Sequence, residues 1–296
     1  MGKHSIKSWI VATRPWSFPA SVMPVVVTLT YLFWSGCDID WIVGVWTLVN
    51  VVLFHAAGNT WSDYHDYKYG VDSEDTIGGV SITGGEFTAH EIKMLSLTLL
   101  SVAVTGGLFL LWLKGLPVLL LGAAGCLLTL LYPWMKYRAL GDVDIFLTYS
   151  ILPMIGTSYV TTGLFYCDVL WLSVPVGLIT VAILHANNMR DVQYDRRAKI
   201  KTFVMKIGAK ASAYIYAFEL LLPFVWCVVC MFFGVLPIWS LLVLVALKPA
   251  IENVRSALNY IADGDNVVAH HDELTAKLQL LFSLLLSASF IIAAFV

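Results

Sequence analysis

Nine long apolar segments alternate with polar connections along the 296-residue chain. The apolar segments are unbroken runs of about 18–22 residues, a length that fits membrane-spanning helices and not the alternating strands of a barrel. The connections are very short between some spans and long and polar between others. We predict the spans at residues 17–35, 41–58, 92–113, 116–133, 143–164, 169–188, 211–234, 237–256 and 275–296.

Composition supports this reading. Hydrophobic residues make up 59% of the chain and charged residues only 13%, whereas soluble domains carry about 25% charged residues. The fold class is therefore an all-α integral membrane protein with about nine transmembrane helices, and its first partner is the lipid bilayer. No basic tract of the kind that binds nucleic acid is present, so we expect no nucleic-acid partner.

Positive charge predicts the orientation. With the N-terminus inside, 17 of the 18 Lys and Arg residues fall at or near the inner face, and Lys114 alone lies outside. Basic residues in short loops favour the cytoplasmic side of a membrane. We therefore predict a multi-pass protein of the inner (cytoplasmic) membrane. Its N-terminus and long polar loops are expected to be cytoplasmic and its C-terminus outside.

Two acidic clusters lie where the second and sixth spans end. The first cluster contains Asn59, Asp63 and Asp66 and continues to Asp72. If the membrane helix continues through the cluster, Asn59, Asp63 and Asp66 lie on one face. Transfer of a carboxylate from water to hydrocarbon costs several kcal/mol of free energy, so these acidic side chains need polar or cationic partners.

The second cluster has the same pattern of an Asn followed four residues later by an Asp. It comprises Asn187, Asn188, Arg190, Asp191 and Asp195. Magnesium binds through a few carboxylates together with substrate phosphates. Two rows of oxygen ligands facing one another across a cavity therefore predict a diphosphate held through bridging Mg²⁺. The arginine is expected to neutralise phosphate charge.

The equal spacing of the clusters suggests an internal duplication. Asn59 and Asn187 are 128 residues apart, as are Asp63 and Asp191. This predicts two four-helix halves, at about residues 10–135 and 136–256, with a ninth helix at 275–296 completing a ring. Transporters also use repeats, so a membrane carrier stays open as an alternative. Its acids, however, should lie near the bilayer midplane and not at the helix ends.

Three other features are interpreted as structural. The Cys227 and Cys230 pair falls within a span and is expected to be part of the core. The glycine-rich segment 78–85, which follows Glu74 and Asp75, matches no phosphate-binding loop and is expected to act as a lid. The polar stretch 257–274, with His270 and His271, is expected to be a solvated interfacial loop.

Several stretches resemble the UbiA superfamily of intramembrane aromatic prenyltransferases, and within it the 1,4-dihydroxy-2-naphthoate polyprenyltransferases. The likeness spans nearly the whole chain, and the combination of motifs is specific. Three departures are Ser62, where the family usually has Asn, Thr76 and Ile77, where it usually has a basic residue before the glycine pair, and Asp142, where it has Glu. The stretches that carry the resemblance are residues 9–21, 59–72, 137–142 and 187–202.

The resemblance implies one prenyltransferase domain over residues 1–296, with nine helices around a central cavity capped from the cytoplasm. It implies Mg²⁺ as cofactor, bound with diphosphate by Asp63, Asp66, Asp191 and Asp195, and a catalytic role for Arg138. The substrate-binding residues we expect are Asn59, Asp72, Tyr132, Asn187, Asn188, Arg190 and Lys201.

The same resemblance implies the reaction. A polyprenyl group would pass from polyprenyl diphosphate to 1,4-dihydroxy-2-naphthoate with decarboxylation, giving demethylmenaquinone for menaquinone biosynthesis. An enzyme of the same fold acting on another aromatic acceptor, such as 4-hydroxybenzoate, is the alternative. Aromatic residues near the inner ends, among them Tyr132, could face an allylic cation, although Tyr and Trp are also ordinary residues of the membrane interface.

Overall fold

The computed structural model describes residues 4–73, 80–263 and 268–296, and it is helical with no strand over these ranges. Eight helical stretches of the described residues are long and apolar enough to cross a membrane. The long helices are α2 (Pro19–Trp34), α3 (Trp41–Lys68), α5 (Ala89–Lys114), α6 (Leu116–Lys136), α9 (Val169–Arg190), α11 (Phe203–Phe232) and α14 (His271–Phe295). The short ones are α1 (Ile6–Ala12), α4 (Val80–Thr83), α7 (Gly141–Phe146), α8 (Leu152–Thr162), α10 (Val192–Arg197), α12 (Leu247–Leu258) and α13 (Tyr260–Asp263).

The ninth predicted span, 237–256, is present in a divided form. It begins as a 3₁₀ segment, η3 (Ile238–Ala246), and continues as α12. A 3₁₀ run of this length is uncommon because its hydrogen bonds have poorer geometry than those of an α-helix. The predicted fold class of an all-helical membrane protein with about nine spans is confirmed.

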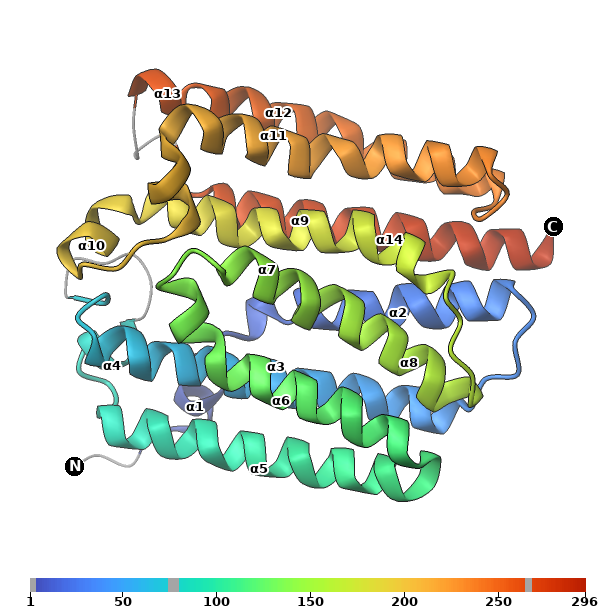
Figure 1. Ribbon diagram of the computed structural model, residues 1–296, viewed down its shortest axis with the longest axis horizontal. Helices are drawn as coiled ribbons and strands as arrows, with labels where there is room; N and C mark the ends of the chain where they lie inside the picture. The colour runs from blue at the N-terminus through green and yellow to red at the C-terminus, as the bar shows by residue number, and fades with distance from the viewer. Residues whose placement is uncertain (1–3, 74–79, 264–267) are drawn as a thin grey trace.

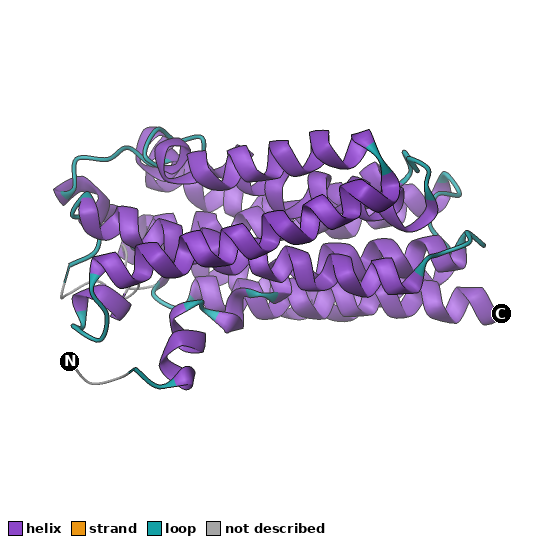
Figure 2. Cartoon of the chain, turned by 90° about the horizontal axis from the view of Figure 1, so that it is seen from below, coloured by secondary structure: helices purple, strands orange, loops and turns teal. Residues whose placement is uncertain are grey.

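The long helices run side by side, as Figure 1 shows. The N-terminus and the short helices α4, α10 and α13 lie at one end of the bundle, and the C-terminus lies at the other (Figures 1 and 2). Helix α14 packs against both α2 and α9. The last helix therefore closes the bundle between its first and sixth spans.

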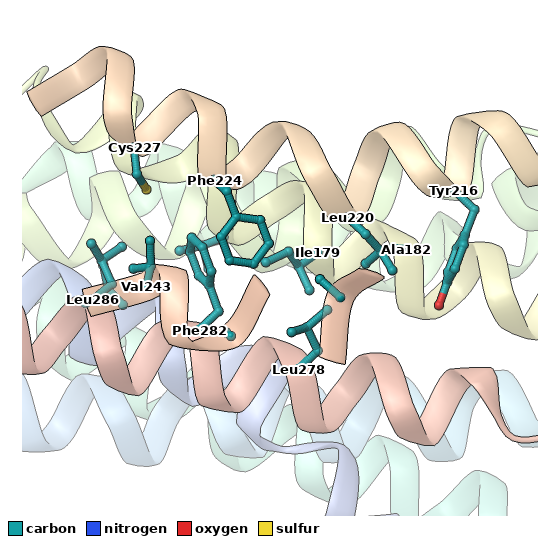
Figure 3. Close-up of a cluster of buried hydrophobic side chains, with 14 of the residues drawn as sticks. Ile179, Ala182, Tyr216, Leu220, Phe224, Cys227, Val243, Leu278, Phe282 and Leu286 are labelled. Carbon is teal, nitrogen blue, oxygen red and sulfur yellow. The ribbon is translucent and has the colours of Figure 1, made fainter. Parts of the chain in front are cut away.

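The apolar core is concentrated in the second half of the chain. Its largest cluster joins α9, α11, α14 and η3, with Phe224 and Phe282 in contact at its centre (Figure 3). Cys227 and Cys230 are buried in this cluster as free thiols, which agrees with their expected role as core residues. Helices α5 and α6 bury much less of their surface. One side of the bundle is therefore tightly packed and the other is more open.

The fifth span contains a π-helical segment that the sequence did not predict. Residues 143–164 were expected to form one helix, but η2 (Leu147–Ile151) separates α7 from α8. Pro153, at the start of α8, has no N–H to donate to the carbonyl four residues earlier. Single π-turns of this kind occur frequently at functional sites, and Thr148 and Tyr149 of η2 line the cavity described below.

The stretch 257–274 differs from the expected solvated loop. Residues 260–263 form α13, and His271 begins α14 with its side chain buried. Residues 269, 270, 272 and 273 line the cavity. Glu74, Asp75 and the first two residues of the predicted glycine-rich lid, 78 and 79, lie outside the described residues, whereas Val80–Thr83 form α4.

Helix α9 approaches η2 closely at Gly177. A Cβ atom at this position would lie 2.6 Å from a ring carbon of Phe146 and 2.8 Å from Cβ of Ser150. Overpacking of this kind destabilises a protein by about 1–3 kcal/mol. We expect Gly177→Ala to lower the melting temperature of the purified protein in detergent.

Gly122→Ala is the matched control, because Gly122 lies in α6 with no atom within 4 Å of an added Cβ. Alanine favours a helix over glycine by roughly 0.5–1 kcal/mol, so this variant should melt at the same temperature or higher. Equal melting of the two variants would show that α9 and η2 are not in close contact.

Candidate active site

A cavity of about 810 Å³ runs through the more open side of the bundle. Its walls come from α3, α5, α6, η2, α8 and α9, with the start of α14 at its rim. One end is polar and contains residues of both acidic clusters. The rest is apolar, with Leu111, Val118, Leu119 and Val160 among its lining residues. The cavity can therefore hold a ligand with an anionic head and a long hydrocarbon tail.

The first cluster lies on a continuous helix, as expected. The predicted span ended at residue 58, but α3 continues to Lys68 and carries Asn59, Asp63 and Asp66 with it. Asn59 and Asp66 line the cavity. Asp63 is almost completely buried beside it, and its Oδ1 accepts a hydrogen bond from Nη2 of Arg14, which does line the cavity.

Arg14 is held in a strained backbone conformation. Its φ of 56° and ψ of 60° place it in the left-handed region immediately before Pro15, a conformation that costs a non-glycine residue roughly 1–2 kcal/mol. The turn is fixed by Asn59, whose Nδ2 donates to the carbonyl of Thr13 at 2.9 Å and to Oγ of Ser17 at 3.0 Å. Strain that the surroundings enforce is frequent at functional sites. Here the strained turn positions the Arg14 guanidinium beside Asp63 of the first acidic cluster.

Three donors hold Asp66. Lys136 Nζ lies 3.0 Å from Oδ2, Tyr137 Oη donates to Oδ1 at 2.7 Å, and Ser62 Oγ donates to Oδ2 at 3.2 Å. Ser62, one of the departures from the family pattern, therefore supports an aspartate directly. Burial raises the pKa of the Tyr137 hydroxyl, and the Asp66 carboxylate raises it further. Tyr137 is consequently a neutral donor to Asp66.

The second cluster departs from a continuous helix. Helix α9 ends at Arg190, and Asp191 caps it before α10 begins at Val192. The backbone N–H of Asp191 still donates to Asn187, and that of Asp195 to Asp191, both at 2.9 Å. Asn187, Asp191 and Asp195 are therefore still linked by two backbone hydrogen bonds across the break.

Arg190 is tied to two carboxylates. Its Nε and Nη2 atoms each donate a hydrogen bond of 2.8 Å to Asp191, and its Nη1 donates to Asp272 of α14 at 2.7 Å. Two parallel bonds between arginine and a carboxylate fix geometry as well as charge. The end of α9 is therefore attached to the start of α14.

The two clusters face one another closely enough to interact. Burial raises the pKa of Asp195 to about 7; the Lys136 cation opposes this rise, and the Asp191 and Asp66 carboxylates add to it. Burial likewise raises the pKa of Asp72 to about 7, with Asp66 and Asp63 adding to the rise. Lys136 thus stands between residues of both clusters.

The carboxylates fit a hard divalent cation. Several buried carboxylate oxygens have no hydrogen-bond partner among the described residues, and a buried polar atom without a partner is costly. All-oxygen ligand sets of this kind suit Mg²⁺. These oxygens are Asp63 Oδ2, Asp72 Oδ2, Asp144 Oδ1 and Asp195 Oδ2.

Most residues predicted from the sequence meet at this cavity. Asp63 is buried beside the cavity and is hydrogen-bonded to Arg14, which lines it. Those that line it are Asn59, Asp66, Asp72, Tyr132, Asn187, Asn188, Arg190, Asp191 and Asp195.

Arg138 and Lys201 are not among the lining residues. The Arg138 side chain is exposed, and its guanidinium carbon lies 4.5 Å from the centre of the Trp134 ring. Lys201 is also exposed, and its backbone N–H donates to the carbonyl of Tyr137 at 3.2 Å. In this conformation neither side chain reaches the cavity, in contrast to what the resemblance implies.

The site also contains Arg14 and Asp272, whose roles were not predicted. Asp144 and Tyr149 line the cavity as well. The Arg-Pro pair before the first span was a usable signal for Arg14. No local signal marks Asp272, because its partner Arg190 is 82 residues away.

Loss of the ion pair between Arg190 of α9 and Asp272 of α14 should lower catalytic efficiency. In Asp272→Asn the arginine keeps its bonds to Asp191 but loses a charged partner, and a hydrogen bond between charged groups contributes about 1.5–3 kcal/mol. We expect kcat/KM for the reaction proposed below to fall about tenfold, with magnesium dependence retained. Glu273→Gln removes the charge of a neighbouring exposed carboxylate that also lines the cavity but is not a partner of Arg190, and it should keep activity near that of the wild type. Equal losses in the two variants would assign the effect to general rim charge.

Comparison with known proteins gives a consistent match. The pattern of the UbiA prenyltransferase family matches residues 21–257. A relative from Xenopus tropicalis named UbiA prenyltransferase domain-containing protein 1 is 31% identical over 229 residues, which are 75% of this chain and 66% of the relative. A relative of the same name from Dictyostelium discoideum is 33% identical over 224 residues, which are 70% of this chain and 66% of the relative. The matched part is thus just under two thirds of these relatives' length.

Solved structures share the fold. A UbiA homolog from Aeropyrum pernix K1 superposes with a TM-score of 0.70 at 14% identity, covering 98% of this chain and 99% of that one. A UbiA homolog from Archaeoglobus fulgidus bound to GPP and Mg²⁺ gives a TM-score of 0.62 at 12% identity. The match covers 95% of this chain and 99% of that one. The relatives named above do not carry the name of a dihydroxynaphthoate enzyme, so that closer resemblance stays a prediction.

Proposed function

The chain belongs to the UbiA prenyltransferase family, and we propose that it transfers a polyprenyl group from polyprenyl diphosphate to 1,4-dihydroxy-2-naphthoate, giving demethylmenaquinone. The observation that carries the proposal is one cavity with two acidic clusters at its polar end and an apolar remainder. Such a cavity matches the two chemically different parts of a polyprenyl diphosphate.

The acidic residues have the role of holding Mg²⁺. The proposed ligands are Asp63, Asp66, Asp191 and Asp195, with Asp72 in reach of the same space. When bound, magnesium would neutralise the diphosphate and make it a better leaving group. The Mg²⁺-bound archaeal homolog has the same fold, which supports this assignment without identifying the ligands here.

Three basic residues complete the electrostatics. Arg14, Lys136 and Arg190 each hold one of the aspartates and also line the cavity. Positioned cations stabilise the negative charge that develops on a departing diphosphate, and in a site that excludes water they do so strongly. They also orient the carboxylates before substrate arrives.

The bond changes follow from this polarity. The bond between the allylic C1 and the diphosphate oxygen breaks, and the oxygen keeps the electron pair. The aromatic carbon that bears the carboxylate attacks C1, and carbon dioxide then leaves so that the ring recovers its aromaticity. Tyr132 and Tyr149 line the cavity near these groups, and aromatic faces attract a cationic carbon.

The remaining assignments rest on the same proposal. We place residues 1–296 in one domain of two four-helix halves and a ninth helix. The family match ends at residue 257, and the bond from Arg190 to Asp272 supports including α14. The predicted inner-membrane topology puts the polar end of the cavity and the N-terminus on the cytoplasmic side, which the excess of basic residues at that end supports.

The test is a radiolabelled assay of the purified protein in detergent with a long-chain polyprenyl diphosphate, dihydroxynaphthoate and Mg²⁺. We expect demethylmenaquinone to form, and removal of magnesium with EDTA to abolish it because the diphosphate then keeps its full charge. Readdition of Mg²⁺ should restore turnover.

A parallel reaction with 4-hydroxybenzoate distinguishes the alternatives. Product with that acceptor alone would keep the reaction class and change the acceptor. Absence of diphosphate release with either acceptor would favour the membrane carrier.

A further inference from the structure

A second cluster of metal-ligating side chains lies where α7, α9 and α11 meet. Asp142 at the start of α7, His185 of α9 and Glu219 of α11 each bring a ligand atom within 4.8 Å of the other two. None of the three lines the cavity. The cluster is therefore separate from the prenyl-transfer site, although both are attached to the same helix.

The cluster is buried and incompletely bonded. His185 is fully buried and the Glu219 side chain is only 7% exposed. Nδ1 of His185 lies 3.2 Å from Oε1 of Glu219 and 4.0 Å from Oδ2 of Asp142. Oε2 of Glu219 and both carboxylate oxygens of Asp142 have no hydrogen-bond partner among the described residues. Two buried carboxylates thus share one imidazole, and their negative charge is not matched by it.

Apolar and aromatic groups surround the cluster. The rings of Phe203 and Tyr216 lie 6.0 Å and 6.3 Å from that of His185. Tyr216 directs its hydroxyl away, to Oγ1 of Thr275 at 2.6 Å (Figure 3 shows the direction of this side chain). No Lys or Arg side chain is paired with Asp142, His185 or Glu219 in the described part of the chain.

We propose that Asp142, His185 and Glu219 form a binding site for a divalent first-row transition metal ion of the Zn²⁺ class. Zinc binds imidazole and carboxylate ligands at about 2.0–2.2 Å, so tetrahedral ligands lie roughly 3.4 Å apart. The two measured separations from His185 bracket this value, and small side-chain rotations would bring the ligands together. The imidazole favours zinc over magnesium, which prefers oxygen ligands alone.

The site would link three helices at the polar end of the bundle. Asp142 follows the segment that carries Lys136 and Tyr137, and His185 precedes Asn187 by two residues. A metal here would fix the end of α9, where Asn188 and Arg190 face the cavity, against α7 and α11. Three protein ligands leave one coordination position of a four-coordinate zinc ion for water.

Metal retention tests the proposal. The full-length protein in detergent is stripped with a chelator, incubated with Zn²⁺ or Mg²⁺, passed through a desalting column and analysed by mass spectrometry of the metal. We expect wild type to keep about one Zn²⁺ per chain and no Mg²⁺ at this site. His185→Gln and Glu219→Gln should each lose that zinc, whereas Asp191→Asn, which alters only the prenyl-transfer cluster, should keep it.

A spectroscopic readout distinguishes this site from zinc bound by the cavity carboxylates. Co²⁺ substituted into the four-coordinate site should give a strong visible absorption band in wild type and Asp191→Asn, and the band should be absent in both glutamine variants. Where a glutamine variant does not fold, Asp142→Asn at the partly exposed edge gives the same comparison. Wild type without retained zinc, or equal retention in all variants, would overturn the proposal. Neither result depends on turnover, so the proposed reaction is tested separately.

Discussion

Asp63→Asn should abolish prenyl transfer, with kcat/KM reduced by at least about 10³-fold. Asparagine keeps the shape of the side chain but removes its charge. The substitution takes away an oxygen that we propose binds magnesium, and it leaves the guanidinium of Arg14 without its closest anion. Loss of one partner of a buried ion pair is strongly unfavourable because the remaining charge stays desolvated. The measurement is the radiolabelled assay at saturating Mg²⁺, with size-exclusion chromatography to confirm that the variant folds.

Asp40→Asn provides a control on the same helix. Asp40 caps the opposite end of α3, where it accepts the N–H of Val43 at 3.1 Å and an ion pair from Lys114 at 3.1 Å. Asparagine also caps helices well, so activity should stay within about twofold of wild type. An active Asp63→Asn protein would rule out Asp63 as a required magnesium ligand.

Arg14→Gln should produce the second largest loss. The residue lines the cavity beside Asp63, and burial, which by itself lowers its pKa, is outweighed by Asp63, Asp72 and Asp66, which raise it. Arg14 therefore stays charged at any working pH. Removal of a positioned donor to developing negative charge costs about 10²–10³-fold in kcat. We also expect a higher KM for polyprenyl diphosphate. Steady-state kinetics over a range of diphosphate concentrations separate the two effects.

Arg138→Gln is the comparison that matters most for Arg14. The resemblance assigns a catalytic role to Arg138, whereas the structure places its side chain over Trp134, outside the cavity lining. From the geometry we expect only a small loss in this variant. If Arg138→Gln were inactive and Arg14→Gln active, the family-based assignment would hold, and Arg138 would have to swing into the cavity during turnover.

The sequence predicted the features that depend on local spacing. Hydrophobic runs located the eight described helices of membrane-spanning length and the divided ninth segment, because a helix that crosses lipid must be apolar over its length. The repeat of Asn and Asp four residues apart identified both acidic clusters, and the side chains of Asn59, Asp66, Asn187 and Asp191 do converge on one cavity. These signals can be read without knowledge of which helices are neighbours.

The features that were missed depend on contacts between distant segments. Arg14 meets Asp63 across 49 residues, and Arg190 meets Asp272 across 82. Nothing in the local sequence selects these partners from the other basic and acidic residues. The break in α9 at Asp191 and the π-helical segment η2 were also missed, because a hydrophobic run does not report which hydrogen-bond register its backbone adopts.

The closure of the bundle by α14 sets an order of events during synthesis. The helix packs against α2, which lies near the other end of the chain. During translation, the first span therefore waits in the bilayer without this neighbour until the segments between α2 and α14 have emerged from the ribosome. The rim of the cavity gains Asp272 only at that moment. The completed site therefore requires α14, and a nascent chain that stalls before this helix cannot display it.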